Sequence, residues 1–253
     1  MKNIITWNVN GIRAAEKKGL FSWFAKTAPD ILCLQETKAQ PDQLSETFID
    51  FPGYSCYWES AQKKGYSSVA VYSRHKPLSV GNLGIKEYDD EGRCQVLEYQ
   101  DFVLFNCYFP NSQEGGARLD YKLGFCAAVL DKTSKLAARG TSVLVCGDYN
   151  IAHKPIDLAH PKQNETNPGY LPEERAWMDS FIQAGFVDAF RLFVKEGGHY
   201  TWWTYRSNAR ANNVGWRIDY HCVNEAFASR VKSVSILSDV LGSDHCPVSI
   251  TLA

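Results

Sequence analysis

The sequence predicts an α/β fold in which two β-sheets pack face to face and helices lie outside them. Short apolar runs bounded by turn residues recur along the whole chain, as strands of a layered protein do. Longer segments with helical spacing separate only some of these runs, so a regular strand–helix alternation does not fit. No linker rich in Pro, Gly or Ser interrupts the 253 residues, so we expect one domain over residues 1–253.

Ten runs have the length and the residue types of strands. Each is a short stretch rich in aliphatic or aromatic residues, and β-branched and aromatic side chains favour the extended conformation. In chain order the predicted strands are Ile4–Trp7, Ile31–Leu34, Tyr54–Trp58, Val69–Tyr72, Val96–Tyr99, Val103–Tyr108, Val143–Cys146, Tyr200–Trp203, Ile218–Val223 and Val248–Leu252.

Three longer segments, Gly19–Thr27, Arg118–Arg139 and Pro172–Ala184, have the apolar spacing of helices. The last begins with a proline followed by two glutamates. Proline suits a first helical turn because its missing N–H would be unpaired there, and carboxylates are favoured at the positive end of the helix dipole. We therefore expect a helix to begin at Pro172.

The composition excludes several classes of protein. Hydrophobic residues at 45% and charged residues at 22% suit a packed core and argue against wholesale disorder. No run approaches the roughly 18 apolar residues of a membrane helix, and the first residues lack a signal peptide's apolar region. The eight cysteines stand singly, several of them in apolar runs. We therefore expect reduced core thiols in an intracellular, cytoplasmic protein rather than a zinc cluster or a disulfide framework.

Charge is balanced overall, with a net value of −1, but it is unevenly distributed. Ser60–Lys76 holds four basic residues and Tyr200–Arg217 holds three, and neither has an acidic residue. Glu87–Asp101 holds six acidic residues and one arginine. The basic stretches could bind a polyanion on one face of the protein, or they could be two solvated loops.

Polar side chains follow six of the apolar runs. Singly, such residues are more often part of local turns. Because strand ends in a packed sandwich converge at one edge, the six positions together could share one cleft. The polar residues are Asn8, Asn10, Gln35, Glu36, Tyr108, Asn111, Asp148, Asn150, Asp219, Asp244 and His245.

Carboxylates gathered in a cleft repel one another, so this cluster needs a cation or raised pKa values. Glu36, Asp244 and Asn8 offer hard oxygen donors without a thiolate, which suits Mg²⁺ or Mn²⁺. His245 directly follows Asp244, so both face the cleft only if the backbone turns there. Asp219 is the natural partner for His245, since it would orient the imidazole and favour its protonated form.

The residue types of this cluster favour hydrolysis of a phosphate ester. The sequence has no P-loop and no Ser or Cys beside a base, whereas metal ligands and phosphate donors are plentiful. Asn150 and Tyr108 can donate hydrogen bonds to phosphate oxygens, and Asp148 can lie beside an attacking water.

Six stretches, in this order, resemble the exonuclease III family of apurinic/apyrimidinic (AP) endonucleases, which belongs to the endonuclease/exonuclease/phosphatase superfamily. The resemblance covers essentially the whole chain, and Asn208–Tyr220 is its most specific part. The stretches are Trp7–Gly11, Leu34–Lys38, Tyr108–Asn111, Gly147–Asn150, Asn208–Tyr220 and Leu237–Pro247.

The resemblance implies a four-layered α/β sandwich of two mixed, mostly antiparallel sheets with helices outside. It implies cleavage of DNA on the 5′ side of an abasic site, leaving a 3′-hydroxyl, together with 3′→5′ exonuclease and 3′-phosphodiesterase or phosphatase activity. The expected cofactor is Mg²⁺ or Mn²⁺, and the expected partner is double-stranded DNA with abasic sites or blocked 3′ ends. We expect a monomer that does not bind membranes and that is associated with the nucleoid when on DNA.

By resemblance, Glu36 is a metal ligand with Asn8 and Asp244 nearby, and a second ion position is implied near Asp148, Asn150 and His245. Asp148 positions or deprotonates the nucleophilic water, or protonates the leaving group. The remaining implied roles fall into three sets. Tyr108, Asn150 and His245 contact the phosphate, and Asp219 pairs with His245; Trp202, Trp216 and Ile218 form a pocket for the abasic sugar; Arg13, Tyr66, Asn111, Lys162, Asn164, Tyr205 and Arg206 grip the DNA backbone.

The chain departs from this family at several positions. Asn10 stands where some members have Asp, which lowers the charge of the metal site. Glu114 lies in a loop where some members place a basic residue, and His153, Lys154 and His160 replace acidic or amide residues. These departures leave the balance among the activities open.

Other interpretations stay open from the residues alone. Ordinary core packing would also explain Trp202, Trp216 and Ile218. Other superfamily enzymes, such as an inositol-phosphate phosphatase, a sphingomyelinase-like diesterase or a sequence-blind nuclease, would share Glu36 and Asp148 but would not need Asn208–Tyr220. A non-catalytic nucleic-acid-binding module would not need to retain the carboxylates.

Overall fold

In the computed structural model, which describes all of residues 1–253, twelve strands form two six-stranded sheets. Sheet A has the order β11 (Val231–Ile236), β12 (Val248–Leu252), β1 (Lys2–Asn8), β2 (Ile31–Gln35), β4 (Val69–Ser73) and β3 (Ser55–Glu59). Sheet B has the order β5 (Ser79–Gly81), β6 (Cys94–Glu98), β7 (Val103–Tyr108), β8 (Val143–Asp148), β10 (Asp219–Asn224) and β9 (Phe186–Asp188).

The two sheets have the same internal arrangement. One central pair is parallel in each, β1 with β2 in sheet A and β7 with β8 in sheet B, and every other pair is antiparallel. The sheets are therefore mixed and mostly antiparallel, as predicted.

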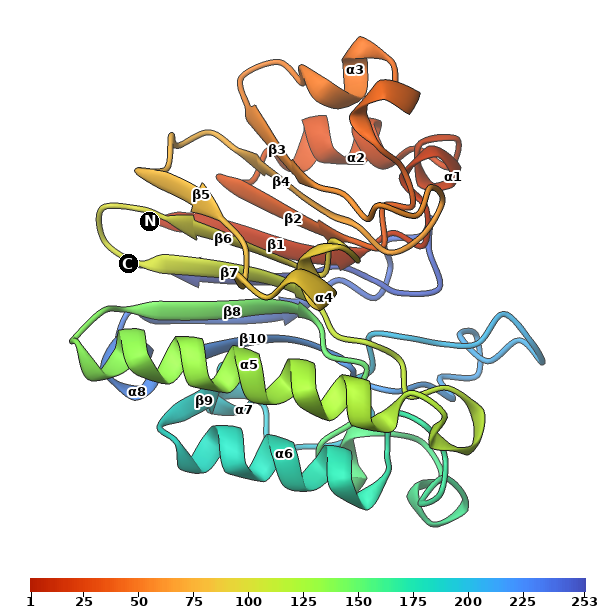
Figure 1. Ribbon diagram of the computed structural model, residues 1–253. Helices are drawn as coiled ribbons and strands as arrows, with labels where there is room; N and C mark the ends of the chain where they lie inside the picture. The colour runs from red at the N-terminus through yellow and green to blue at the C-terminus, as the bar shows by residue number, and fades with distance from the viewer.

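Helices cover the outer face of each sheet, which completes four layers (Figure 1). The helices α1 (Ile12–Glu16), α2 (Leu20–Thr27) and α3 (Glu46–Ile49) lie over sheet A, and α5 (Leu119–Ala138) and α6 (Pro172–Gln183) lie over sheet B. The short helices α4 (Lys86–Asp89), α7 (Phe190–Phe193) and α8 (Glu225–Ala228) lie in connections. None of these helices combines the length and the apolar character that crossing a bilayer requires.

Both faces of the central strands are buried, because alternate side chains of a strand point to opposite faces. In β2, Ile31 and Cys33 join the apolar cluster between the sheets, whereas Leu32 and Leu34 pack with α1 and α2. A third cluster lies between sheet B and the helices α5 and α6. The core therefore holds the sheets in a fixed relationship to each other and to the helices.

A buried polar contact fixes how the two sheets align near one end. Gln35 Nε2 of sheet A donates to Asn106 Oδ1 of sheet B at 2.7 Å and to Thr6 Oγ1 at 2.8 Å. All three residues are fully buried. Because an unpaired buried amide costs about 1–3 kcal/mol, sliding one sheet over the other would be penalised.

The three predicted helices are found, and nine of the ten predicted strands coincide with or overlap an observed strand. The prediction of a strand over Tyr200–Trp203 is wrong: this segment is irregular and makes only single bridges, from Trp202 to Trp216 and to His245. Its aromatic residues are of the type that favours strands, but only Trp203 is buried, where it packs with Ala209 and Cys246. Three strands that the sequence analysis missed, β5, β9 and β11, are short or partly exposed, so they lack a continuous apolar run.

Candidate active site

Six strands bring polar residues to the same end of the sandwich, where the strands of both sheets begin or end; this end is called the cavity edge below. The parallel strands β1, β2, β7 and β8 end there, and the antiparallel strands β10 and β12 begin there. In sheet B, Asp148 lies opposite Tyr108 on one side and Asp219 on the other. The predicted convergence of strand ends therefore follows from the strand directions.

Left-handed backbone conformations turn the chain sharply after three of these strands. Asn10, Glu36 and Asn150 have φ angles of 46°, 55° and 51°. Asparagine tolerates this conformation, but a glutamate there is uncommon, and such strain typically marks functional positions. A bend at Gly242–Asp244 likewise lets the consecutive residues Asp244 and His245 both line the site.

A cavity of about 300 Å³ lies at this edge. Most of its lining is polar and carries the carboxylates, and a smaller apolar part next to Asp244 and His245 is formed by Trp202, Trp216 and Ile218. The lining residues are Asn10, Glu36, Tyr108, Asn111, Asp148, Asn150, Asn167, Pro168, Gly169, Trp202, Trp216, Ile218, Asp244 and His245.

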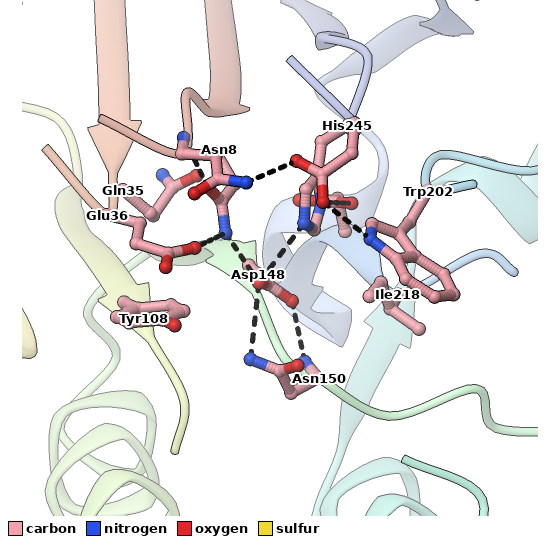
Figure 2. A network of polar contacts seen from close by, with 12 residues as sticks. Asn8, Gln35, Glu36, Tyr108, Asp148, Asn150, Trp202, Ile218 and His245 are labelled. Atoms are coloured by element: carbon pink, nitrogen blue, oxygen red, sulfur yellow. Dashed lines mark hydrogen bonds and ion pairs between the residues drawn. The ribbon is translucent and has the colours of Figure 1, made fainter. Parts of the chain in front are cut away.

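Asn8 lies behind the cavity and joins two of its carboxylates (Figure 2). Its Nδ2 donates to Glu36 Oε2 at 3.0 Å and to Asp148 Oδ2 at 2.8 Å, and its Oδ1 accepts the backbone N–H of Asn10 at 2.9 Å. Asn8 is fully buried, so it is Asn10 that reaches the cavity wall. The geometry therefore gives Asn8 a linking position between the two sheets rather than a place among the lining ligands.

Lys38 neutralises part of the negative charge of the cavity carboxylates. Its Nζ lies 2.9 Å from Glu36 Oε1 and donates to Asn10 Oδ1 at 2.6 Å. Asn10 Nδ2 in turn donates to Asp244 Oδ1 at 3.0 Å. No role for Lys38 was evident from the sequence, although it lies in the stretch Leu34–Lys38, because its proximity to the carboxylates depends on the turn at Glu36.

His245 lies between two buried aspartates. Its Nδ1 lies 2.9 Å from Asp219 Oδ2, and its Nε2 lies 3.9 Å from Asp148 Oδ2. The Thr201 hydroxyl donates to the same Asp219 oxygen at 2.6 Å and accepts the backbone N–H of Ile218. The imidazole is therefore held by Asp219, while its Nε2 is beyond hydrogen-bond distance of Asp148 and faces the cavity.

The buried charges shift the pKa values of this group. Burial, with a smaller contribution from the charge of Asp219, raises the pKa of Asp148 to about 7. Burial alone would lower the pKa of His245, but the charges of Asp219 and Asp148 outweigh it and raise the value to about 10. At neutral pH, His245 is therefore an imidazolium.

The site has two sets of donors that fit a divalent cation. Glu36, Asn10 and Asp244 offer carboxylate and amide oxygens, with no thiolate among the lining residues. Asp148, Asp219 and His245 each have a possible ligand atom within 4.8 Å of the others, and His245 could bind an ion only in its neutral form. Asp219 Oδ1 is buried without a hydrogen-bond partner, which an approaching cation would relieve.

Two further predicted residues lie where a phosphate could contact them. Burial and the charge of Glu36 raise the pKa of Tyr108 well above its ordinary value, so its phenol stays a hydrogen-bond donor. Asn150 Nδ2 donates to Phe109 O at 3.0 Å and to Asp148 Oδ2 at 3.2 Å. Asn111, which also lines the cavity, donates to Asn150 Oδ1 at 3.3 Å.

The apolar part of the lining contains the three residues of the predicted sugar pocket. The rings of Trp202 and Trp216 meet edge to face at 6.2 Å, and Ile218 packs with them. Trp202 Nε1 also donates to Asp244 Oδ2 at 3.1 Å, which joins the apolar part of the lining to the polar part. Both indoles are only partly buried, so they contribute surface to the cavity as well as packing.

The residues predicted to grip DNA are more dispersed. Asn111 alone lines the cavity. Tyr66 accepts hydrogen bonds from Arg93 and Arg118 nearby, and Asn164 bonds mainly within its own loop. Exposed positions are found for the other four: Arg13, Lys162, Tyr205 and Arg206.

The interpretation of Tyr200–Arg217 as a basic surface needs correction. Arg217 is buried and pairs with Asp157 at 2.8 Å and Asp188 at 2.6 Å. Arg210 donates to backbone carbonyls and stacks on a tryptophan. Only Arg206 remains as an exposed cation of this segment, so folding removes most of the charge that the sequence suggests.

The stretch Ser60–Lys76 also does not form one face. It spans β4, whose first residue lies at the end of the strands that carries the cavity and whose last residue lies at the other end of sheet A. Lys63 and Lys64 precede the strand, whereas Arg74 and Lys76 follow it. The basic residues are therefore divided between the two ends of the sheet.

Comparison with known proteins identifies similar chains. Residues 5–245 match the model of the endonuclease/exonuclease/phosphatase family. An exodeoxyribonuclease of Bacillus subtilis is 43% identical over 98% of both chains, and the DNA repair nuclease APEX1 of Danio rerio is 42% identical over 99% of this chain and 82% of its own. The solved structure of the 3′ phosphatase NExo from Neisseria, bound to a product DNA hairpin, superposes with a TM-score of 0.88 at 27% identity and covers 100% of both chains.

Proposed function

The chain belongs to the endonuclease/exonuclease/phosphatase family, and we propose that it is a metal-dependent DNA repair hydrolase that cleaves duplex DNA 5′ to an abasic site, leaving a 3′-hydroxyl. It is an enzyme of the AP endonuclease and exodeoxyribonuclease class, as are relatives at 42–43% identity. We extend the proposal to 3′→5′ exonuclease and 3′-phosphodiesterase or phosphatase activity, which the likeness to a Neisseria 3′ phosphatase supports.

The observation that carries the proposal is a single cavity whose lining has a polar and an apolar part. Asp148 and His245 are among its polar lining residues, and Trp202 and Trp216 form an apolar part of the lining beside them. A sugar that lacks its base is small and leaves the base stack at little cost, whereas an intact nucleotide carries a base that such a cavity would exclude. One cavity can therefore hold the scissile phosphate and select for the abasic sugar.

The residues suggest how the phosphodiester is hydrolysed. Asp148, with a pKa near neutrality, can hold an attacking water and accept its proton while the water oxygen bonds to phosphorus and the P–O3′ bond breaks. The leaving 3′-oxygen then takes up a proton, from Asp148 or from solvent, and becomes the 3′-hydroxyl. The His245 imidazolium, oriented by Asp219, can donate from Nε2 to a phosphate oxygen. Tyr108 can donate a further hydrogen bond to the phosphate. Asn150 can do the same once its Nδ2 gives up its hydrogen bond to Phe109 O or to Asp148 Oδ2.

We propose Mg²⁺ or Mn²⁺ as the ion, held by Glu36, Asp244 and Asn10. Hard oxygen donors favour these ions. When bound, a divalent cation supplies positive charge that stabilises the phosphate in the transition state. A second ion position at Asp148, Asn150 and His245 is an alternative within the same proposal, and it requires a neutral His245 because an imidazolium has no lone pair for a cation.

The proposed substrate is double-stranded DNA with abasic sites or blocked 3′ ends. Arg13, Lys162 and Arg206 are exposed and available for contacts with the DNA backbone, which fix the register without reading bases. We propose further that the protein acts as a monomer in the cytoplasm, on the nucleoid when bound to DNA.

The proposal is tested with a duplex that carries one tetrahydrofuran analogue of an abasic site. Purified protein with Mg²⁺ should cut once, 5′ to the analogue, and EDTA should abolish the cut. The matched control is the same duplex without the lesion. Equal cutting of both duplexes would favour a sequence-blind nuclease over the proposed function.

A further inference from the structure

Behind the cavity, Lys122 of α5 and Glu174 of α6 form an ion pair with no exposed surface. Lys122 Nζ lies 2.6 Å from Glu174 Oε1, and both side chains are 0% exposed. Burying two charges costs several kcal/mol per ion before their attraction is counted, and apolar residues of similar volume often stabilise a protein as well. A pair of this kind therefore suggests a task beyond holding two helices together.

The ammonium group of Lys122 contacts the backbone of Asn150, which lies in the part of the cavity that is proposed to hold the phosphate. Lys122 Nζ also donates to the backbone carbonyl of Asn150 at 2.7 Å. Asn150 has a left-handed φ of 51°, with which the chain turns after β8. Lys122, which does not line the cavity, holds the carbonyl of this turn in place.

The carboxylate of Glu174 accepts hydrogen bonds from the backbone of Gly169–Leu171, the segment next to the part of the cavity that is proposed to hold the sugar. Glu174 Oε2 accepts the backbone N–H groups of Gly169, at 2.7 Å, and of Leu171, at 2.9 Å. The hydroxyl of Ser112 donates to its other oxygen, Oε1. Every oxygen of this buried carboxylate is thus engaged, and two of its four partners are backbone groups of the cavity segment.

Gly169 lies next to both groups that the pair holds: its own N–H binds Glu174, and its backbone lies close to the Asn150 carbonyl that binds Lys122. This residue has a φ of +92°, and a Cβ at its position would lie 3.2 Å from both Asn150 O and the ring of Trp216. Its carbonyl accepts the N–H of Ala152 at 2.8 Å. There is therefore little room for any side chain at position 169 between Asn150 and Trp216.

We propose that Lys122 and Glu174 are positioning residues: the pair sets the spacing between Asn150 at the phosphate end and Gly169, packed on Trp216, at the sugar end. The inference rests on the proposed function for the parts played by Asn150 and Trp216. Neither Lys122 nor Glu174 lines the cavity, so both act through the groups they hold.

The test compares Lys122→Met with Val129→Ala. Val129 is buried on the same helix and packs in the core cluster over sheet B, so its truncation destabilises the protein without removing a contact to Asn150. Rates are measured on the abasic duplex well below the melting temperature of each variant. Because a misplacement of about 1 Å can cost 10²-fold, Lys122→Met should lower kcat by about 10- to 100-fold with KM changed less than about threefold. Val129→Ala should leave kcat within about twofold of the wild type, because its cavity costs stability rather than geometry at the site.

A second readout does not depend on any activity. Hydrogen exchange of the Gly169 and Leu171 amides, taken relative to exchange in β8, should speed up in Lys122→Met and not in Val129→Ala. Glu174→Gln, which keeps the size of the side chain, carries both tests if Lys122→Met does not fold. An unchanged kcat together with unchanged relative exchange would overturn the inference. Failure of the wild type to cut abasic DNA would instead refute the proposed function, and the exchange result would still decide whether the pair holds this segment.

Discussion

Asp219 holds His245 through one carboxylate oxygen: Asp219 Oδ2 lies 2.9 Å from His245 Nδ1. The same oxygen accepts the Thr201 hydroxyl, which fixes the carboxylate itself. The imidazole can therefore rotate little, and its Nε2 stays directed into the cavity beside Asp148. Both the charge state and the direction of His245 depend on this contact.

Replacing Asp219 by Asn should slow incision of the abasic duplex by about 10²- to 10⁴-fold, because the amide neither stabilises the imidazolium nor fixes its orientation. Thr201→Ser, which keeps the hydroxyl, is the matched control and should retain most activity. Single-turnover kinetics measure both variants. Activity of Asp219→Asn within about threefold of the wild type would remove Asp219 from the mechanism.

Trp216→Ala should impair abasic incision by about 30-fold or more, since truncating a tryptophan that lines a binding site commonly costs about 2 kcal/mol or more. The affinity for Mn²⁺, measured by calorimetry, should stay unchanged because Trp216 contacts none of the carboxylates. A loss of metal affinity larger than the loss of incision would return Trp216 to the role of a core residue.

Lys38→Met should bind Mn²⁺ about two- to fivefold more tightly in the absence of DNA. Its ammonium now engages Glu36 Oε1 and Asn10 Oδ1, and a partly exposed ion pair of this kind contributes up to about 1 kcal/mol. Lys17→Met, at an exposed lysine outside the cavity, is the control. Weaker binding by Lys38→Met would mean that Lys38 supports the ligands instead of competing with the ion.

Stability should decline in acid partly because of Asp157. Burial opposes ionisation of Asp157, but the charge of Arg217, followed by that of Arg191, lowers the pKa of its carboxyl below the ordinary value. A carboxyl with a lower pKa in the folded state adds stability above the unfolded pKa of about 4, and this contribution is lost as pH falls through the folded value. The free energy of unfolding should therefore fall with decreasing pH below about 4.

Urea titrations of the wild type and of Asp157→Asn measure this contribution. The variant should be less stable at pH 7 and should lose less stability on acidification. Glu91 and Asp101 also have lowered pKa values, but they act equally in both proteins, so the difference between the two slopes belongs to Asp157. Equal slopes would contradict the assignment.

Much of this architecture could be predicted because its strands are buried on both faces and so appear as apolar runs. The polar residues after those runs could be grouped because strand direction decides which ends meet. β5 could not be found, since all three of its residues are exposed. Tyr200–Trp203 was mistaken for a strand because aromatic residues favour both strands and buried loops.

Other features depend on contacts between distant parts of the chain. Arg217 looks like a surface cation until Asp157 and Asp188 are placed beside it. Lys122 and Glu174 lie 52 residues apart, and nothing in either segment indicates the pair. Lys38 approaches Glu36 and Asn10 only because both of these residues adopt left-handed conformations. Local patterns could not reveal such relationships.

The account depends most on Asp148, which lies among Asn8, Asn150 and His245 at the meeting point of both sheets. Single-turnover incision of the tetrahydrofuran duplex by Asp148→Asn, with thermal melting and DNA affinity measured beside it, tests the account most directly. We predict a loss of about 10³-fold or more in rate, with melting and affinity nearly unchanged. A folded Asp148→Asn protein that cuts within about tenfold of the wild-type rate would contradict it.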